Sequence, residues 1–205
     1  MSKKRRLIVL GIIGRDPCAG VAWEVLYYLE GLRRLGHNVY YIEDDREWPY
    51  DPVTNRVTKD CRYAVRFIRR MMGWCGMHQD HWAYRAASRD GQIYGMSKAQ
   101  FHRAFETADA LFNITGSTVL YGEHLKVPVR VYVQTDPGVA EIEIAKGCRE
   151  TIELAKAHTH FLTFAENLGA ADCGLPHQMF SYRPTRQPIV MDWFTGGAKD
   201  RKSVV

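Results

Sequence analysis

The feature that most constrains this chain is a strand–helix–strand pattern near its beginning. Residues 7–13 form a nearly unbroken apolar run, which is typical of a strand buried on both faces of a parallel sheet. A glycine-bearing loop at 14–20 follows, and apolar residues then recur at helical spacing until Gly36, where the helix is expected to end. Residues 38–42 form a second apolar run, and acidic residues at 43–45 close it. Such a unit is right-handed and parallel, and ligands bind at the carboxyl ends of its strands.

The rest of the chain continues this alternation. Further strands are expected at 110–114, 129–133 and 161–164, and further helices at 59–72, 97–107 and 139–157, the last with a break near Gly147. About five strands alternating with helices predict an α/β fold: a Rossmann-like, doubly wound, mainly parallel sheet with helices on both faces. Residues 46–58 are expected to form a surface loop, and 73–95 carry no clear pattern.

Composition limits the kind of protein. The 205 residues are 46% hydrophobic and 25% charged, which is ordinary for a folded chain. We expect one Rossmann-like domain over 1–194, with 195–205 as a tail or the start of a linker. The net charge of +5 suits anionic ligands but does not by itself indicate nucleic acid. Five scattered cysteines without a CxxC pair favour a reducing compartment, and no apolar run is long enough to span a membrane, so we expect a cytoplasmic protein.

Polar residues follow four of the expected strands. The candidate binding residues are Gly14, Arg15, Gly20, Gly116, Ser117, Thr135, Glu166 and Asn167, and the candidate catalytic acids are Asp16 and Asp136. The carboxyl ends of parallel strands share one edge, so these residues are expected to approach one cleft. A carboxylate there could deprotonate a hydroxyl group or hold sugar hydroxyls. The alternative is that the acids only cap turns and helices, and that the glycines only permit tight turns.

The glycine spacing matches neither of two familiar phosphate-binding loops. Gly11, Gly14 and Gly20 do not match G-x-G-x-x-G, although Glu43 lies where a ribose-binding acid would lie in a dinucleotide-binding fold. No G-x-x-x-x-G-K-[ST] sequence is present, so a P-loop NTPase is excluded. What remains is a loop before a helix N-terminus, suited to an anion or to sugar hydroxyls.

Two further patterns have a plain and a sharper interpretation. The expected helix 59–72 carries a basic stripe formed by Arg62, Arg66, Arg69 and Arg70. It is either a solvated helix face or a surface that docks onto an anionic membrane or substrate. Cys75, His78 and His81 recur every three residues and could bind zinc, but no fourth ligand is visible, which favours ordinary surface residues.

Residues 9–23 and 31–39 together resemble the opening of GT-B glycosyltransferases, in which a glycine-bearing loop follows the first strand and L-G-H-x-V leads into the second. Residues 134–138 and 163–167 are similar to uncharacterised bacterial glycosyltransferase-like proteins. The resemblance implies a two-domain enzyme whose N-terminal half binds the acceptor, while a C-terminal half, whose signatures this chain lacks, binds the nucleotide-sugar donor. It also implies metal-independent catalysis with no cofactor, with Asp16 as the first candidate for the catalytic base and Asp136 as the second.

These observations leave several functions open. The leading expectation is the acceptor-binding half of a glycosyltransferase that moves a sugar from a nucleotide-sugar to a hydroxyl acceptor. The alternatives are a sugar-nucleotide epimerase of the same fold, a non-catalytic glycan- or nucleotide-binding module, and, more weakly, an NAD-dependent oxidoreductase.

Overall fold

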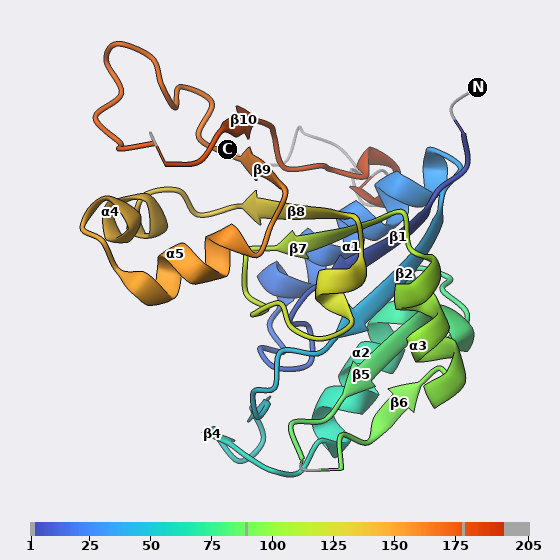
Figure 1. Cartoon of the computed structure of the whole chain (residues 1–205). Helices are drawn as coiled ribbons and strands as arrows, with labels where there is room; N and C mark the ends of the chain where they lie inside the picture. Colours follow the sequence, from blue (N-terminus) through green and yellow to red (C-terminus); the bar gives the residue numbers. More distant parts are fainter. Residues whose placement is uncertain (1–2, 89, 178, 195–205) are drawn as a thin grey trace, which may run out of the picture.

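A single eight-stranded sheet organises the molecule (Figure 1). The computed structural model describes residues 3–88, 90–177 and 179–194. Across the sheet the strand order is β10-β9-β8-β7-β1-β2-β5-β6. The strands are β1 (Arg6–Leu10), β2 (Asn38–Glu43), β5 (Trp82–Arg85), β6 (Ile93–Gly95), β7 (Ala110–Ile114), β8 (Val129–Gln134), β9 (His160–Thr163) and β10 (Tyr182–Pro184). All neighbouring pairs are parallel except β5 with β6, so the fold is Rossmann-like, as predicted.

The chain reverses its direction of travel across the sheet beside β1. From β1 it proceeds through β2 and β5 to the edge strand β6, and it then returns to the other side of β1 to form β7, β8, β9 and β10. Leu7 therefore pairs with Val39 on one side and with Ala110 on the other. The switch point lies between β1 and β7, and crevices for ligands open at such points, outside the carboxyl ends of the strands.

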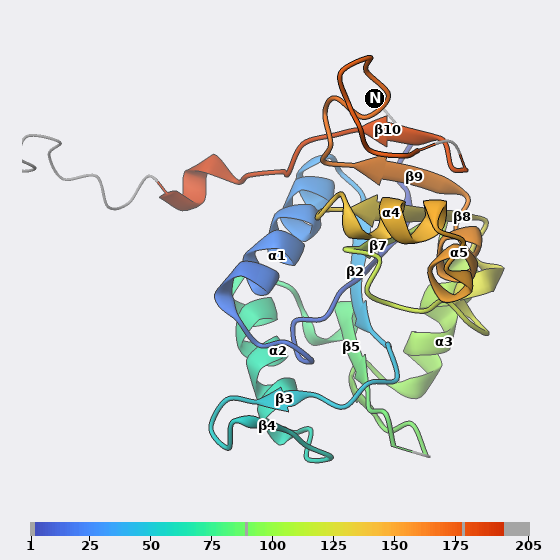
Figure 2. The same cartoon turned by 90° about the vertical axis from the view of Figure 1, so that its left-hand side faces the viewer.

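Helices cover both faces of the sheet (Figure 2). The helices α1 (Ala19–Arg34) and α2 (Arg62–Trp74) lie on one face, and α3 (Lys98–Thr107), α4 (Val139–Ala145) and α5 (Arg149–Lys156) lie on the other. Because successive strand residues point to opposite faces, the core is divided in two. Val9 and Tyr41 belong to the cluster under α1 and α2, while Ile8 and Ile42 belong to the cluster that includes Phe101 of α3.

Local signals in the sequence fix the helix ends. Ser97 caps α3 in a reciprocal arrangement with Gln100, as its position predicted. Gly36, two residues after the end of α1, has a φ of +88°, a conformation that glycine adopts readily. Gly147, with a φ of +81°, separates α4 from α5 and confirms the expected break.

The main differences from expectation concern short strands. The predicted strands near 7–13, 38–42, 110–114, 129–133 and 161–164 all exist, but β5, β6 and β10 were not predicted. The expected surface loop at 46–58 contains a small antiparallel pair, β3 (Tyr50–Asp51) and β4 (Arg56–Val57). The expected tail or linker at 195–205 lies outside the described residues.

Candidate functional site

Polar loops follow the carboxyl ends of four neighbouring parallel strands, β1, β7, β8 and β9. We call their shared side of the sheet the carboxyl edge. The predicted site residues that follow these strands are Gly14, Arg15, Asp16, Gly116, Ser117, Thr135, Asp136, Glu166 and Asn167. Gly20 instead lies inside the first turn of α1, not in the loop. Within the described ranges, no hydrogen bond joins the side chain of a candidate residue in one loop to that of a candidate residue in another, so these residues share an edge without forming one bonded cluster.

A buried carboxylate holds the first loop. Glu43, the last residue of β2, is 0% exposed, and its two oxygens accept the backbone N–H groups of Gly14 at 2.7 Å and Arg15 at 2.6 Å. The hydroxyl of Tyr41 donates to the same carboxylate at 2.6 Å. Burial raises the pKa of Glu43 to about 8, although these hydrogen bonds oppose the rise. The two loop amides therefore already have an acceptor, and Glu43 exposes no surface to a ribose.

Asp16 lies on the outer side of the same loop, with 47% of its side chain exposed. Arg15 donates from Nε to Asp16 at 3.1 Å and from Nη1 to the buried Asp45 at 2.9 Å. Burial opposes the charge of Arg15, but Asp45 and Asp16 outweigh it and raise the pKa of the guanidinium. The guanidinium thus links the candidate base to the carboxyl end of β2.

A second partly buried acid faces the loop after β8. Glu24, on the second turn of α1, accepts a hydrogen bond from Thr135, and burial raises its pKa despite that bond. The hydroxyl of Tyr28, one turn further along, is buried and has no hydrogen-bond partner among the described residues. The pair of Glu24 and Thr135 spans α1 and the end of β8, on either side of the switch point.

The loop after β7 is strained for a structural reason. Gly116 has a φ of +64°, and a Cβ atom there would lie 2.2 Å from the ring of Tyr132, so only glycine fits. Its neighbour Thr115 also has a positive φ, +61°, and a buried hydroxyl without a partner in the described part of the chain. Ser117 donates its hydroxyl to the carbonyl of Ile114 at 3.1 Å. Gly116 therefore shapes the turn at the switch point. Packing against Tyr132 is enough to require a glycine here, whether or not a ligand binds.

The remaining candidates are exposed. Glu166 forms a paired contact with Arg186, at 2.8 Å and 3.1 Å, and Asn167 lies beside it on the surface. The carboxylate of Asp136 is exposed, and in the described ranges it makes no side-chain hydrogen bond or ion pair. Of the two candidate catalytic acids, Asp136 is the less constrained.

The carboxyl end of β2 carries a second buried network, which we call the Asp44 network. The carboxylate of Asp44 accepts hydrogen bonds from Arg85 Nε at 2.8 Å and from the Tyr121 hydroxyl at 2.6 Å, and it lies 3.0 Å from His124 Nε2. Asp44 and His124 are 1% and 0% exposed. Burial alone would raise the pKa of Asp44, but the bonds from His124 and Arg85 outweigh it and lower the pKa. The network joins β2 and β5 to the segment after β7.

A cavity of about 630 Å³, which we call the polar cavity, opens over this network. Its charged lining residues are Asp44, Arg46, Arg85, Asp90, Lys98, His102 and Glu123. The guanidinium of Arg46 stacks on the ring of Tyr121, 3.3 Å from its centre. Both cationic side chains and carboxylates line the cavity, so it offers donors and acceptors, as a ligand with several hydroxyl groups requires.

The basic stripe of α2 is exposed, as all four arginines lie on the surface. Arg62 pairs with Asp60 at 2.6 Å, whereas Arg66, Arg69 and Arg70 have no carboxylate partner among the described residues. Arg70 also lines a groove of about 420 Å³ between α1 and α2, together with Phe67, Met71, Trp74, Trp23 and Pro17. The stripe thus borders an apolar groove, and Trp74 at the end of α2 is 52% exposed.

The possible zinc ligands are otherwise engaged. His78 and His81 each lie 2.7 Å from the same oxygen of Asp80, and the Cys75 thiol donates to the carbonyl of Met72. Over 3–88, 90–177 and 179–194, no three His, Cys, Asp or Glu side chains are grouped so as to hold a metal ion.

Comparisons with known proteins add no family to this description. The chain matches no protein-family model, and a search of curated proteins gave no match. Among the described residues, no helix is both long enough and apolar enough to cross a bilayer. The structure shows an α/β domain with a mainly parallel eight-stranded sheet.

Sequence reasoning missed the Asp44 network and Glu24. Asp44 was visible as one of three acids closing β2, but its partners Arg85 and His124 lie 41 and 80 residues away. The strand β5, which carries Arg85, was not predicted, and so nothing placed this arginine near β2. Glu24 could have been found, because a glutamate early in the helix after β1 faces the carboxyl edge in a fold of this type.

Proposed function

We propose that this chain is the acceptor-binding half of a GT-B glycosyltransferase, which moves a sugar from a nucleotide-sugar to a hydroxyl acceptor. The observation that carries the proposal is the gathering of four polar loops on one edge of a parallel sheet, beside a switch point. A donor-binding half would face the same edge.

In this proposal Asp16 is the catalytic base. It is half exposed at the carboxyl edge, and Arg15 fixes its position by pairing with it and with Asp45. Carboxylates that activate a hydroxyl group must be within hydrogen-bond reach of it, which an exposed, anchored side chain permits. Asp136, exposed after β8, is the second candidate.

The polar cavity is the proposed place for the acceptor. Asp45 connects it to the Asp16 loop, since Asp45 contacts Arg15 and lies between Asp44 and Arg46, which both line the cavity. Its balanced charges suit a neutral polyhydroxyl compound better than a strongly anionic one. Hydrogen bonds to Asp44 hold the side chains of Arg85 and Tyr121 in place in the wall of the polar cavity.

One observation favours a second candidate, a non-catalytic glycan-binding module. Asp16 and Glu166 are both ion-paired, and the amides of Gly14 and Arg15 are occupied by Glu43. A module of this kind would bind sugars at the same edge and transfer none.

We also propose that three arginines of the basic stripe contact an anionic membrane surface. Arg66, Arg69 and Arg70 are exposed without carboxylate partners in the described ranges, beside an apolar groove and an exposed tryptophan. Each arginine near an anionic surface contributes about 1 kcal/mol, so charge reversal of all three should abolish sedimentation with phosphatidylglycerol vesicles. Arg62→Glu is the control, because Arg62 already pairs with Asp60. Equal sedimentation of the triple variant and the wild type would refute the contact.

The experiment for the main proposal measures sugar transfer by the natural protein that carries this chain. Asp16→Asn should lower kcat by about 100-fold or more, because general-base catalysis contributes that much. Glu106→Gln, at an exposed acid of α3, is the matched control and should leave kcat unchanged. Wild-type transfer in both Asp16→Asn and Asp136→Asn would exclude the proposed bases. Sugar binding without any transfer by the wild-type protein would favour the binding module.

A further inference from the structure

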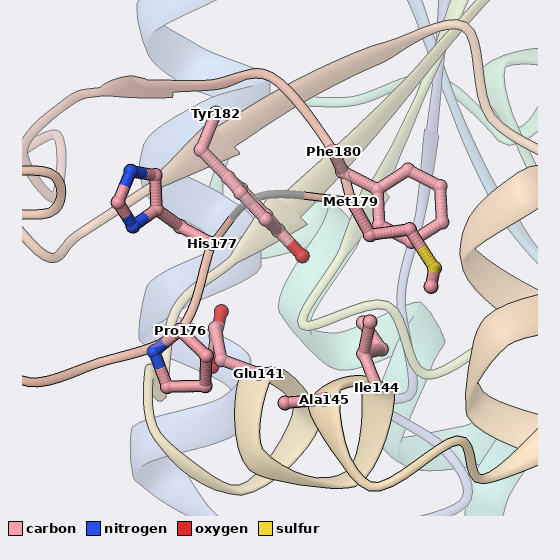
Figure 3. A pocket seen from close by; sticks show the side chains of 8 residues that line it. All are labelled: Glu141, Ile144, Ala145, Pro176, His177, Met179, Phe180 and Tyr182. Carbon is pink, nitrogen blue, oxygen red and sulfur yellow. The ribbon is translucent and has the colours of Figure 1, made fainter.

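A second cavity lies away from the Asp16 loop and the polar cavity, between α4 and the segment that leads into β10 (Figure 3). Its volume is about 380 Å³, which falls in the range of small-molecule sites. Most of its wall is apolar, formed by Ile144, Ala145, Pro176, Met179 and Phe180. We call it the α4 cavity.

Three polar side chains line this cavity, and the Nδ1 atom of one of them, His177, lies 3.3 Å from the carbonyl oxygen of Leu175. The other two enter the apolar wall from opposite sides. Glu141 extends from α4 and Tyr182 extends toward it from the start of β10 (Figure 3). Glu141 is 1% exposed, and one of its oxygens, Oε2, accepts the backbone N–H of Gly138 at 2.7 Å. Its other oxygen, Oε1, and the hydroxyl of Tyr182 are both buried and have no hydrogen-bond partner among the described residues.

Unpartnered buried polar atoms are costly, and here both line the same cavity. Capping α4 requires only the oxygen that binds Gly138, so the cap does not explain why Oε1 and the Tyr182 hydroxyl remain without partners. Burial and the charge of Glu141 raise the pKa of Tyr182, so the phenol keeps its proton and remains a donor. Tyr182 thus presents one free donor to the cavity, and Glu141 presents one free acceptor.

We propose that the α4 cavity binds a small molecule with one hydroxyl group on an apolar body. The ligand hydroxyl accepts a hydrogen bond from the Tyr182 hydroxyl and donates one to Oε1 of Glu141, so both unpartnered atoms gain a partner. The apolar body contacts Ile144, Met179 and Phe180. An ammonium group fits less well, because it cannot accept from Tyr182, and a water molecule would satisfy the polar atoms but leave the apolar wall unfilled.

Nuclear magnetic resonance titration with p-cresol tests this site, with p-xylene as the isosteric probe that lacks the hydroxyl. The amide signals of Ile144 and Phe180 should shift with p-cresol, and p-xylene should bind about tenfold more weakly or worse, since hydrogen bonds to a charged group are worth that much. Tyr182→Phe and Glu141→Gln should each weaken p-cresol binding by about tenfold. Glu143→Gln, an exposed neighbour on the same helix, should change nothing.

Several results would overturn the inference. They are equal affinity for the two probes, unchanged p-cresol binding in both variants, or no shift at Ile144 and Phe180 up to the solubility limit of p-cresol, which would leave the cavity to water. Should Glu141→Gln fail to fold, Tyr182→Phe decides the question, because it removes a hydroxyl that has no partner and should melt no lower than the wild type. None of these readouts depends on sugar transfer, so they test the α4 cavity independently of the proposed function.

Discussion

Two buried glutamates of this molecule have opposite surroundings. Glu43 and Glu141 are 0% and 1% exposed, respectively; Glu43 is the last residue of β2, and Glu141 lies in the first turn of α4. Both oxygens of Glu43 are occupied, by Gly14, Arg15 and Tyr41. Glu141 has one oxygen bound to Gly138 and one with no partner in the described part of the chain.

The number of hydrogen-bond partners distinguishes a structural acid from one that could bind a ligand. A buried acid whose hydrogen bonds are complete holds its neighbours in place and offers nothing to a ligand. A buried acid with a free oxygen, facing a cavity, has capacity left for one. Burial alone therefore does not identify a functional acid; the count of its partners does.

The largest effect should come from Glu43→Ala. This change leaves two backbone amides and the Tyr41 hydroxyl without an acceptor, and it also leaves a void under the first loop. Each unpaired buried group costs about 1–3 kcal/mol, so we expect a loss of about 4 kcal/mol in the free energy of unfolding. Denaturant unfolding measures it. A loss below about 1 kcal/mol would show that the carboxylate does not hold the loop.

The second-largest effect should be a pH dependence of the free energy of unfolding, caused by Glu43. Its folded pKa, raised by burial from the ordinary 4.5 to about 8, means that the folded state keeps a proton that the unfolded state loses. The contribution of Glu43 is therefore fully present below pH 4.5 and falls as pH rises toward 8. Unfolding series at several pH values measure the slope, and Glu43→Gln should flatten it. An equal slope in Glu43→Gln would assign the dependence to other groups.

The smallest effects should belong to the other glutamate and its neighbour. Glu141→Ala removes one capping contact and should cost about 1 kcal/mol in the free energy of unfolding. Tyr182→Phe should cost nothing, since its hydroxyl has no partner among the described residues. A thermal melt of each variant decides. A large loss in Tyr182→Phe would mean that the hydroxyl is satisfied in solution, and the contrast with Glu43 would disappear.

The sequence was informative about long elements and poor at long-range contacts. Residues 7–13 and 129–133 were identifiable because strands buried on both faces are continuous apolar runs. The short strands β5, β6 and β10 have three or four residues each and lie among mixed polar and aromatic residues, so periodicity could not find them.

Site prediction failed for a related reason. The parallel order of the strands brought the loops of Asp16, Gly116 and Asp136 to one edge, and this followed from the pattern. The satisfaction of Glu43, the Asp44 network and the free oxygen of Glu141 depend on partners that are distant in the chain or on the absence of one. Such facts arise only when the chain has folded.

The most direct test of the proposed sugar-handling edge is to locate a bound polyhydroxyl compound on the chain. In a magnetic resonance titration with methyl glucoside, the account predicts shifts at the carboxyl edge, at Arg85, Tyr121 and Thr135. It predicts none at the opposite edge, where Asp109 binds the amide of Arg6. Shifts at that opposite edge, or none at Arg85, Tyr121 and Thr135 up to the solubility limit, would contradict it.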